Sequence, residues 1–100
     1  MKVQNMTNSS GNPVANQFII TDNRWDESGT MWHTEVFQSY ASGIAKRETN
    51  GLAGTKISLD KNKWDCSKTT GKYRNQFLGE NKAETQKKID SGEYTLTDLN

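Results

Sequence analysis

The side chains that most often carry out chemistry are scarce in this chain, which holds one histidine, His33, and one cysteine, Cys66. A metal centre needs several converging ligands, and nucleophilic catalysis needs a nucleophile beside an oriented base. His33 and Cys66 lie far apart in the sequence, and no motif orients them. We therefore expect no metal site, no cofactor and no enzymatic activity. A thiol enzyme built on Cys66 is the weakest alternative, since a small residue packed beside a helix start explains Cys66 equally well.

A basic segment over residues 56–74 is the strongest functional signal. Residues 41–82 hold nine Lys or Arg and four Asp or Glu, whereas acids outnumber bases on either side. The candidate binding residues of this segment are Lys61, Lys63, Trp64, Lys68, Lys72 and Arg74. Together with Tyr73 they place cations near aromatic rings, which suits single-stranded nucleic acid through phosphate contacts and base stacking.

The same residues also have a purely structural explanation, which we favour. Trp64 and Tyr73 would then fill the core, and the cations would form the solvated outer face of a helix that packs on a sheet. Trp25, Trp32 and Tyr40 are open to the same two interpretations: a patch for a protein partner, or a core short of aliphatic side chains. Trp25 remains a candidate binding residue, because a polar loop gives no reason for a large aromatic.

Residues 64–79 predict the amphipathic helix that must position the basic residues. Ser67 is a natural N-cap, and Gly79 supplies the left-handed residue that commonly ends a helix. Tyr73 and Phe77 stand four positions apart and share one face, so we expect them to pack on a sheet. The cations lie on the opposite face.

Four strands are predicted before this helix, over residues 14–21, 30–40, 44–49 and 56–60, from their apolar and polar alternation. Residues 22–29 read as a polar hairpin loop, and Asn50-Gly51 is a strong turn signal. A second helix begins after Asn81, which forms a capping box with Glu84. Residues 93–99 form a short strand or an irregular arm. The predicted fold class is α+β: a four-stranded antiparallel β-meander followed by two helices, the first packed on one face of the sheet.

A chain of 100 residues predicts one domain. Residues 1–13 are rich in Asn, Ser and Thr and predict a flexible N-terminal tail, which leaves residues 14–100 as the folded domain. No apolar run is long enough for a signal peptide or a membrane span, and a single cysteine forms no internal disulfide. We therefore expect a cytoplasmic protein that makes no membrane contact.

Two groups of residues resemble a family of small phage-encoded proteins, a domain of unknown function. They are Phe37-Gln38-Ser39-Tyr40 with Ser42, Ile44 and Ala45, and then Trp64-Asp65, Ser67, Thr69-Thr70, Lys72-Tyr73 and Phe77-Leu78. The similarity extends over residues 14–100, although Cys66 replaces the usual Tyr and the loop at 22–29 is longer than usual. The resemblance implies a phage or mobile-element origin and expression inside a bacterial host.

The leading hypothesis is a non-enzymatic phage accessory protein that binds and modulates a host macromolecule, as counter-defence or host-takeover inhibitors do. Its expected partner is a host protein or a ribonucleoprotein complex. The alternative is a small nucleic-acid-binding module that uses the basic segment 56–74.

Overall fold

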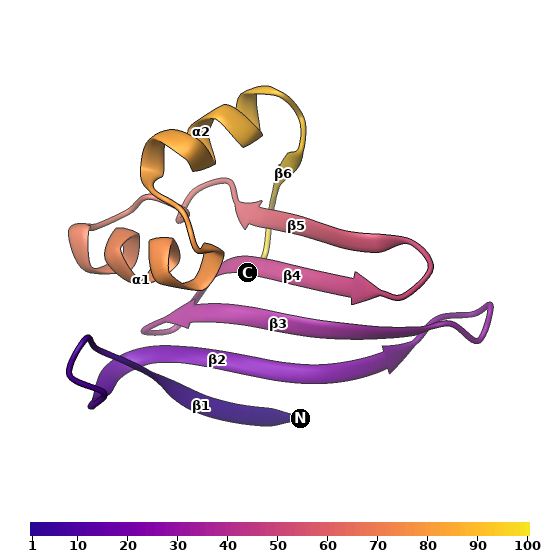
Figure 1. The fold of residues 1–100 in the computed structure, drawn as a ribbon, viewed down its shortest axis with the longest axis horizontal. Helices are drawn as coiled ribbons and strands as arrows, with labels where there is room; N and C mark the ends of the chain where they lie inside the picture. Colours follow the sequence, from indigo (N-terminus) through magenta and orange to yellow (C-terminus); the bar gives the residue numbers. More distant parts are fainter.

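The computed structural model describes residues 1–100 and contains one six-stranded mixed sheet and two helices (Figure 1). The strands are β1 (Lys2–Thr7), β2 (Pro13–Trp25), β3 (Met31–Ser39), β4 (Ser42–Asn50), β5 (Gly54–Asp60) and β6 (Tyr94–Thr97). The helices are α1 (Lys68–Leu78) and α2 (Lys82–Asp90). The strands lie in chain order across the sheet. The α+β class is confirmed, but the predicted count of four strands is wrong, because β1 and β6 extend the sheet at its two edges.

The first added strand replaces the expected tail. Lys2–Thr7 pair antiparallel with β2, from Lys2 opposite Thr21 to Thr7 opposite Pro13. Met6 is only 3% exposed and belongs to the core. An edge strand that pairs on one side and buries one large side chain needs little hydrophobic content. Its polar composition therefore gives no strand pattern in the sequence. Asn8 then closes the turn to β2 by accepting from the amides of Ser10 and Asn12, each at 3.0 Å.

The second correction concerns the predicted loop at 22–29. β2 continues through it to Trp25, which pairs with Met31 of β3. The turn itself is short, because the carboxylate of Asp26 accepts from the amides of Ser28 (3.0 Å) and Thr30 (2.9 Å) and from the indole of Trp32 (3.0 Å). One aspartate thus orders the end of a segment that was expected to be a polar loop.

The last strand, β6, joins the sheet beside β5 in parallel, after the chain has passed through both helices. Its first residue, Tyr94, is 5% exposed, and its hydroxyl donates to Glu80 in the turn between α1 and α2. Of the two alternatives expected for residues 93–99, a short strand and an irregular arm, the structure therefore shows the strand. Neither helix has both the length and the apolar character that crossing a bilayer requires.

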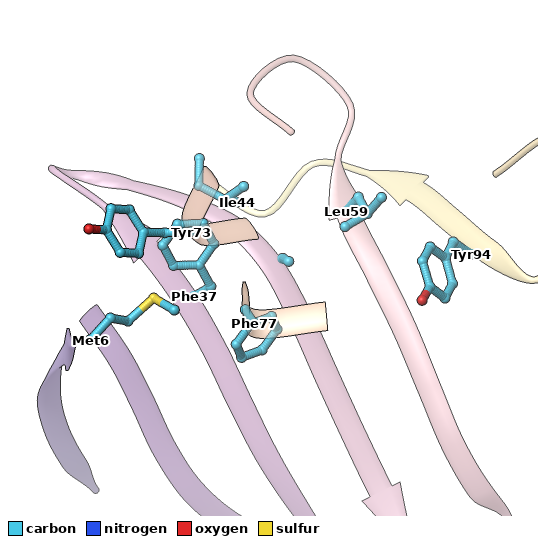
Figure 2. Close-up of a cluster of buried hydrophobic side chains, with 8 residues drawn as sticks. Met6, Phe37, Ile44, Leu59, Tyr73, Phe77 and Tyr94 are labelled. Atoms are coloured by element: carbon cyan, nitrogen blue, oxygen red, sulfur yellow. The ribbon is translucent and has the colours of Figure 1, made fainter. Parts of the chain in front are cut away.

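The core lies between the sheet and α1, as Figure 2 shows. Tyr73 and Phe77 point from α1 toward Phe37 of β3, and the rings of Phe37 and Phe77 are 6.0 Å apart. Ser67 caps α1 by accepting from the amide of Thr70 at 3.1 Å, and Gly79 ends the helix with φ of 72°. The predicted packing of the first helix on one sheet face is confirmed, and its outer face is left to solvent.

Candidate cationic binding site

The outer side of α1 borders an open pocket of about 820 Å³, whose lining contains no hydrophobic residue. Lys68 and Lys72 come from α1, and Lys82 is the first residue of α2. The remaining lining residues are Asp65, Ser67, Gly71, Arg74 and Asn75. Four cationic side chains therefore surround one carboxylate, an arrangement that attracts anions.

Helical geometry explains why these residues meet. Gly71 and Lys72 stand three and four positions after Lys68, and Asn75 stands four and three positions after them, so these residues form a single stripe along α1. Gly71 leaves the middle of this stripe without a side chain. A Cβ placed there would lie 3.7 Å from Nη2 of Arg74 and 3.8 Å from Oδ1 of Asp65. The glycine therefore leaves the middle of the stripe without a side chain, close to these two charged groups.

Arg74 holds the floor together. Its side chain is 1% exposed, and Nη1 donates to the carbonyl of Trp64 (2.8 Å) and to Oδ1 of Asp65 (3.1 Å). Nη2 donates to Oδ1 of Asn75 at 2.9 Å. Arg74 is therefore buried, and the prediction that it belongs to the solvated cations of the outer face is wrong. The guanidinium can be buried because its hydrogen bonds and the Asp65 carboxylate replace most of the water it loses.

Asp65 supplies the negative charge of the site. Its Oδ2 lies 2.6 Å from Nζ of Lys82, and its side chain is 32% exposed. The hydrogen bond from Lys82 holds the pKa of Asp65 below its ordinary value, burial opposes this shift, and Arg74 reinforces it. The carboxylate therefore stays ionised at neutral pH and neutralises one of the four cations, so the pocket keeps a surplus of positive charge.

The structure divides the remaining predicted site residues. Lys61 and Lys63 are exposed in the turn between β5 and α1, outside the pocket lining. Trp64 is half-buried, with the Arg74 guanidinium 5.1 Å from its ring centroid. Tyr73 is 5% exposed in the core. The favoured structural explanation is thus confirmed for Tyr73, and no aromatic residue lines the pocket.

Trp25 lies at the end of the β2–β3 hairpin, at the opposite end of the sheet from α1 (Figure 1). It is 69% exposed, and Met31, its partner across the strands, is 46% exposed. Tyr40 is also exposed, whereas Trp32 is half-buried. Trp25 therefore belongs to a second surface, separate from the cationic pocket.

Lys82 is the site residue that sequence reasoning missed. It stands beyond the end of α1, and only the short turn at 79–81 brings it beside Asp65. No motif of residue types predicts the contact between Lys82 and Asp65. The single sequence signal is the basic excess itself, which extends as far as residue 82.

The two residues considered for thiol chemistry are not brought together. Cys66 is exposed, and its Sγ lies 3.7 Å from Oγ1 of Thr70. Thr70 contacts Ser39 at the end of β3 (3.0 Å), whereas His33 lies six residues earlier on the same strand and bonds to Asn23 at 2.9 Å. At the usual rise along a strand, roughly 20 Å separates these two parts of β3. No three His, Cys, Asp or Glu side chains converge as a metal site would require.

Fold and pocket together define a small α+β protein with a polar, cationic pocket on the outer face of its first helix. The chain belongs to a family of unknown function (DUF8033), whose family model matches residues 1–93. No curated protein and no solved structure matches the chain.

Proposed function

We propose that the protein is a non-enzymatic phage accessory protein that binds nucleic acid of its host, free or within a ribonucleoprotein complex, through the cationic pocket. The observation that supports this proposal is the pocket lining, which holds four cations, one carboxylate and no hydrophobic side chain. Such a lining disfavours an apolar ligand and favours a phosphate backbone, whose binding is largely electrostatic.

The free charges of the site lie on the two lysines of α1. Lys68 and Lys72 have no carboxylate within 4 Å, whereas Arg74 and Lys82 are both bound to Asp65. Binding of phosphate by exposed lysines of this kind is favourable, because it releases the counterions of the nucleic acid. Lys61 and Lys63 are likewise exposed and carry no ion pair, so they add to the positive field between β5 and α1.

The phage origin and the modulation of a host macromolecule rest on the resemblance described above. A small binding protein that occupies host nucleic acid would interfere with whatever host machinery uses it, as counter-defence and host-takeover proteins do. We propose this action in the cytoplasm of the host cell.

The proposal is tested by fluorescence anisotropy with a labelled 12-nucleotide single strand at two salt concentrations. We expect binding to weaken steeply from 50 to 200 mM salt, by roughly tenfold or more if two or three phosphates are contacted. Replacing both Lys68 and Lys72 by Glu abolishes binding. The charge-matched control replaces Lys56 and Lys87, both exposed, outside the pocket lining and without an ion pair. Absence of binding at low salt overturns the proposal.

A second candidate function is docking to a host protein through the end of the β2–β3 hairpin. Trp25 and Met31 are paired across the two strands there, and they are 69% and 46% exposed. Exposed tryptophan is typical of the residues that dominate protein interfaces. If this surface is used, a specific partner is lost from a pull-down with the Trp25→Ser variant. The variant with Lys68 and Lys72 replaced by Glu still captures that partner. A partner retained by the Trp25 variant excludes this surface.

A further inference from the structure

Resting on the proposed function, we infer that the pocket binds a phosphomonoester, namely the terminal 5′-phosphate of a nucleic-acid strand. The site is compact: its cationic residues come from one helical stripe and the first residue of α2. The cations of the pocket therefore form one cluster, which suits a single doubly charged group, and the exposed Lys61 and Lys63 outside the pocket are left for the adjoining phosphates.

The polar groups that the pocket leaves free are donors. The guanidinium of Arg74 can only donate, so the atom of Asn75 that it contacts at 2.9 Å is the amide oxygen. Both hydrogens on Nδ2 of Asn75 remain for a ligand in the pocket. The ammonium groups of Lys68 and Lys72 also only donate, and no carboxylate pairs with either. A ligand that satisfies these groups must present several acceptor oxygens close together, as a phosphate does.

The floor of the pocket adds the charge of the Arg74 guanidinium, of which one nitrogen has no hydrogen-bond partner. Nε of Arg74 is buried and has no hydrogen-bond partner, while both Nη atoms are engaged by protein oxygens. A Cβ at Gly71 would lie 3.7 Å from this guanidinium, so the glycine lets the backbone of the stripe lie close to a buried charge. Arg74 therefore contributes positive potential from beneath the pocket, while Lys68, Lys72 and Asn75 make the direct contacts with the ligand.

Two features favour a terminal phosphate over an internal one. No aromatic residue lines the pocket, so bases gain no stacking surface beside the bound group. A phosphomonoester carries between one and a half and two negative charges at neutral pH, about twice the charge of a diester. Because the cations of the pocket outnumber Asp65, the second negative charge strengthens binding. A terminal phosphate can also enter the pocket, whereas an internal phosphate is held on both sides by the strand.

The experiment compares two 12-nucleotide strands of the same sequence and the same 3′ label, one with a 5′-phosphate and one with a 5′-hydroxyl group. We expect the 5′-phosphorylated strand to bind about tenfold more tightly, which equals about 1.4 kcal/mol. The preference falls below twofold in the Lys68→Ala and Lys72→Ala double variant, whose folding is checked by circular dichroism. It also falls in Asn75→Asp, which replaces the free donor by an acceptor, and it is unchanged in Lys87→Ala.

Failure of this inference and failure of the proposed function give different results. Equal affinity for the two strands overturns the terminal-phosphate assignment and leaves nucleic-acid binding in place. Binding of neither strand overturns both. A 5′-mononucleotide that displaces the labelled strand at the strand's own dissociation constant shows that a free nucleotide is the ligand, and this also overturns the assignment to a strand end.

Discussion

The guanidinium of Arg74 lies over the indole of Trp64, 5.1 Å from the ring centroid, and donates to the backbone carbonyl of the same residue at 2.8 Å. One side chain of α1 thereby fixes the turn that leads into the helix. The same guanidinium orients Asp65 and Asn75, which face the pocket. Arg74 is thus a positioning residue, and the shape of the cationic pocket depends on it.

Replacing Arg74 by Lys is expected to destabilise the protein by about 2 kcal/mol, because one ammonium cannot reproduce the forked contacts of a buried guanidinium. Urea unfolding followed by tryptophan fluorescence measures the change. Lys72→Arg, on the exposed face of the same helix, is the control and should alter stability by less than about 0.5 kcal/mol. Equal stability of Arg74→Lys and wild type would contradict the structural role given to Arg74.

Gly71→Ala is expected to stabilise the fold and weaken binding at the same time. The residue lies inside α1, where alanine is favoured over glycine by up to about 1 kcal/mol. Its new methyl group would meet Arg74 and Asp65 at ordinary contact distances of 3.7 to 3.8 Å. The methyl group would occupy space in the middle of the stripe that a bound phosphate needs, so affinity for the 5′-phosphorylated strand should fall several-fold as the midpoint of urea unfolding rises. A variant that is more stable and binds as tightly as wild type would show that this space takes no part in binding.

The β2–β3 turn should lose its order only in strong acid. The hydroxyl of Ser28, the amide of Thr30 and the indole of Trp32 all bond to Asp26 and lower its pKa to about 2, from an ordinary 3.8. Because the folded pKa lies below the unfolded one, the stabilisation is complete above pH 4 and is lost as the pH falls toward 2. The indole N–H resonance of Trp32 should report a midpoint near pH 2, and Asp26→Asn should remove this transition. A midpoint near pH 4 would mean that these hydrogen bonds do not form in solution.

Alkaline titration should identify Tyr94. Burial raises its pKa to about 12, and the hydrogen bond and negative charge of Glu80 act in the same direction, while Lys88 opposes them. A raised folded pKa means that the stability contribution is complete below pH 10 and is lost as the pH rises toward 12. Absorbance at about 295 nm should show one phenol ionising near pH 12, and Tyr94→Phe should remove that step. The variant should also lose about 1 kcal/mol of stability with the hydrogen bond to Glu80.

Met6→Ala tests whether the first residues belong to the fold. Met6 is 3% exposed within the core, so truncating it should cost about 2 kcal/mol or more. Val3→Ala, at a side chain that is 56% exposed on the same strand, should cost much less. Both changes are measured by urea unfolding. If neither variant differs from wild type, residues 1–7 do not pack on the core in solution.

The parts of this fold that sequence predicts are those set by local chemistry. Ser67 and Gly79 delimit α1, and Asn81 with Glu84 begins α2, because each cap is made by residues within a few positions of one another. The packing of Tyr73 and Phe77 follows from their helical spacing in the same way. Such features need no knowledge of distant parts of the chain.

Long-range pairing explains most of what the sequence did not predict. β1 exists because β2 offers it an edge, and nothing in its own polar residues requires a strand. In the site, Lys68 and Lys72 were predicted from charge and helical phase. The burial of Arg74 and the position of Lys82 at the pocket both depend on ion pairs with Asp65. Asp65 lies outside the helix, and the tertiary fold determines its position.

The register shift between Asn5 and Thr7 of β1 also matters for chain-to-chain association. β1 is an outer strand, so one side of its backbone has free amides and carbonyls that another chain could pair with. The irregularity interrupts that row, and an interrupted row is a poor template for a neighbouring strand. At the other border of the sheet, β6 has only four residues. Neither border offers a long, regular strand, so we expect the protein to resist building sheets between molecules at high concentration.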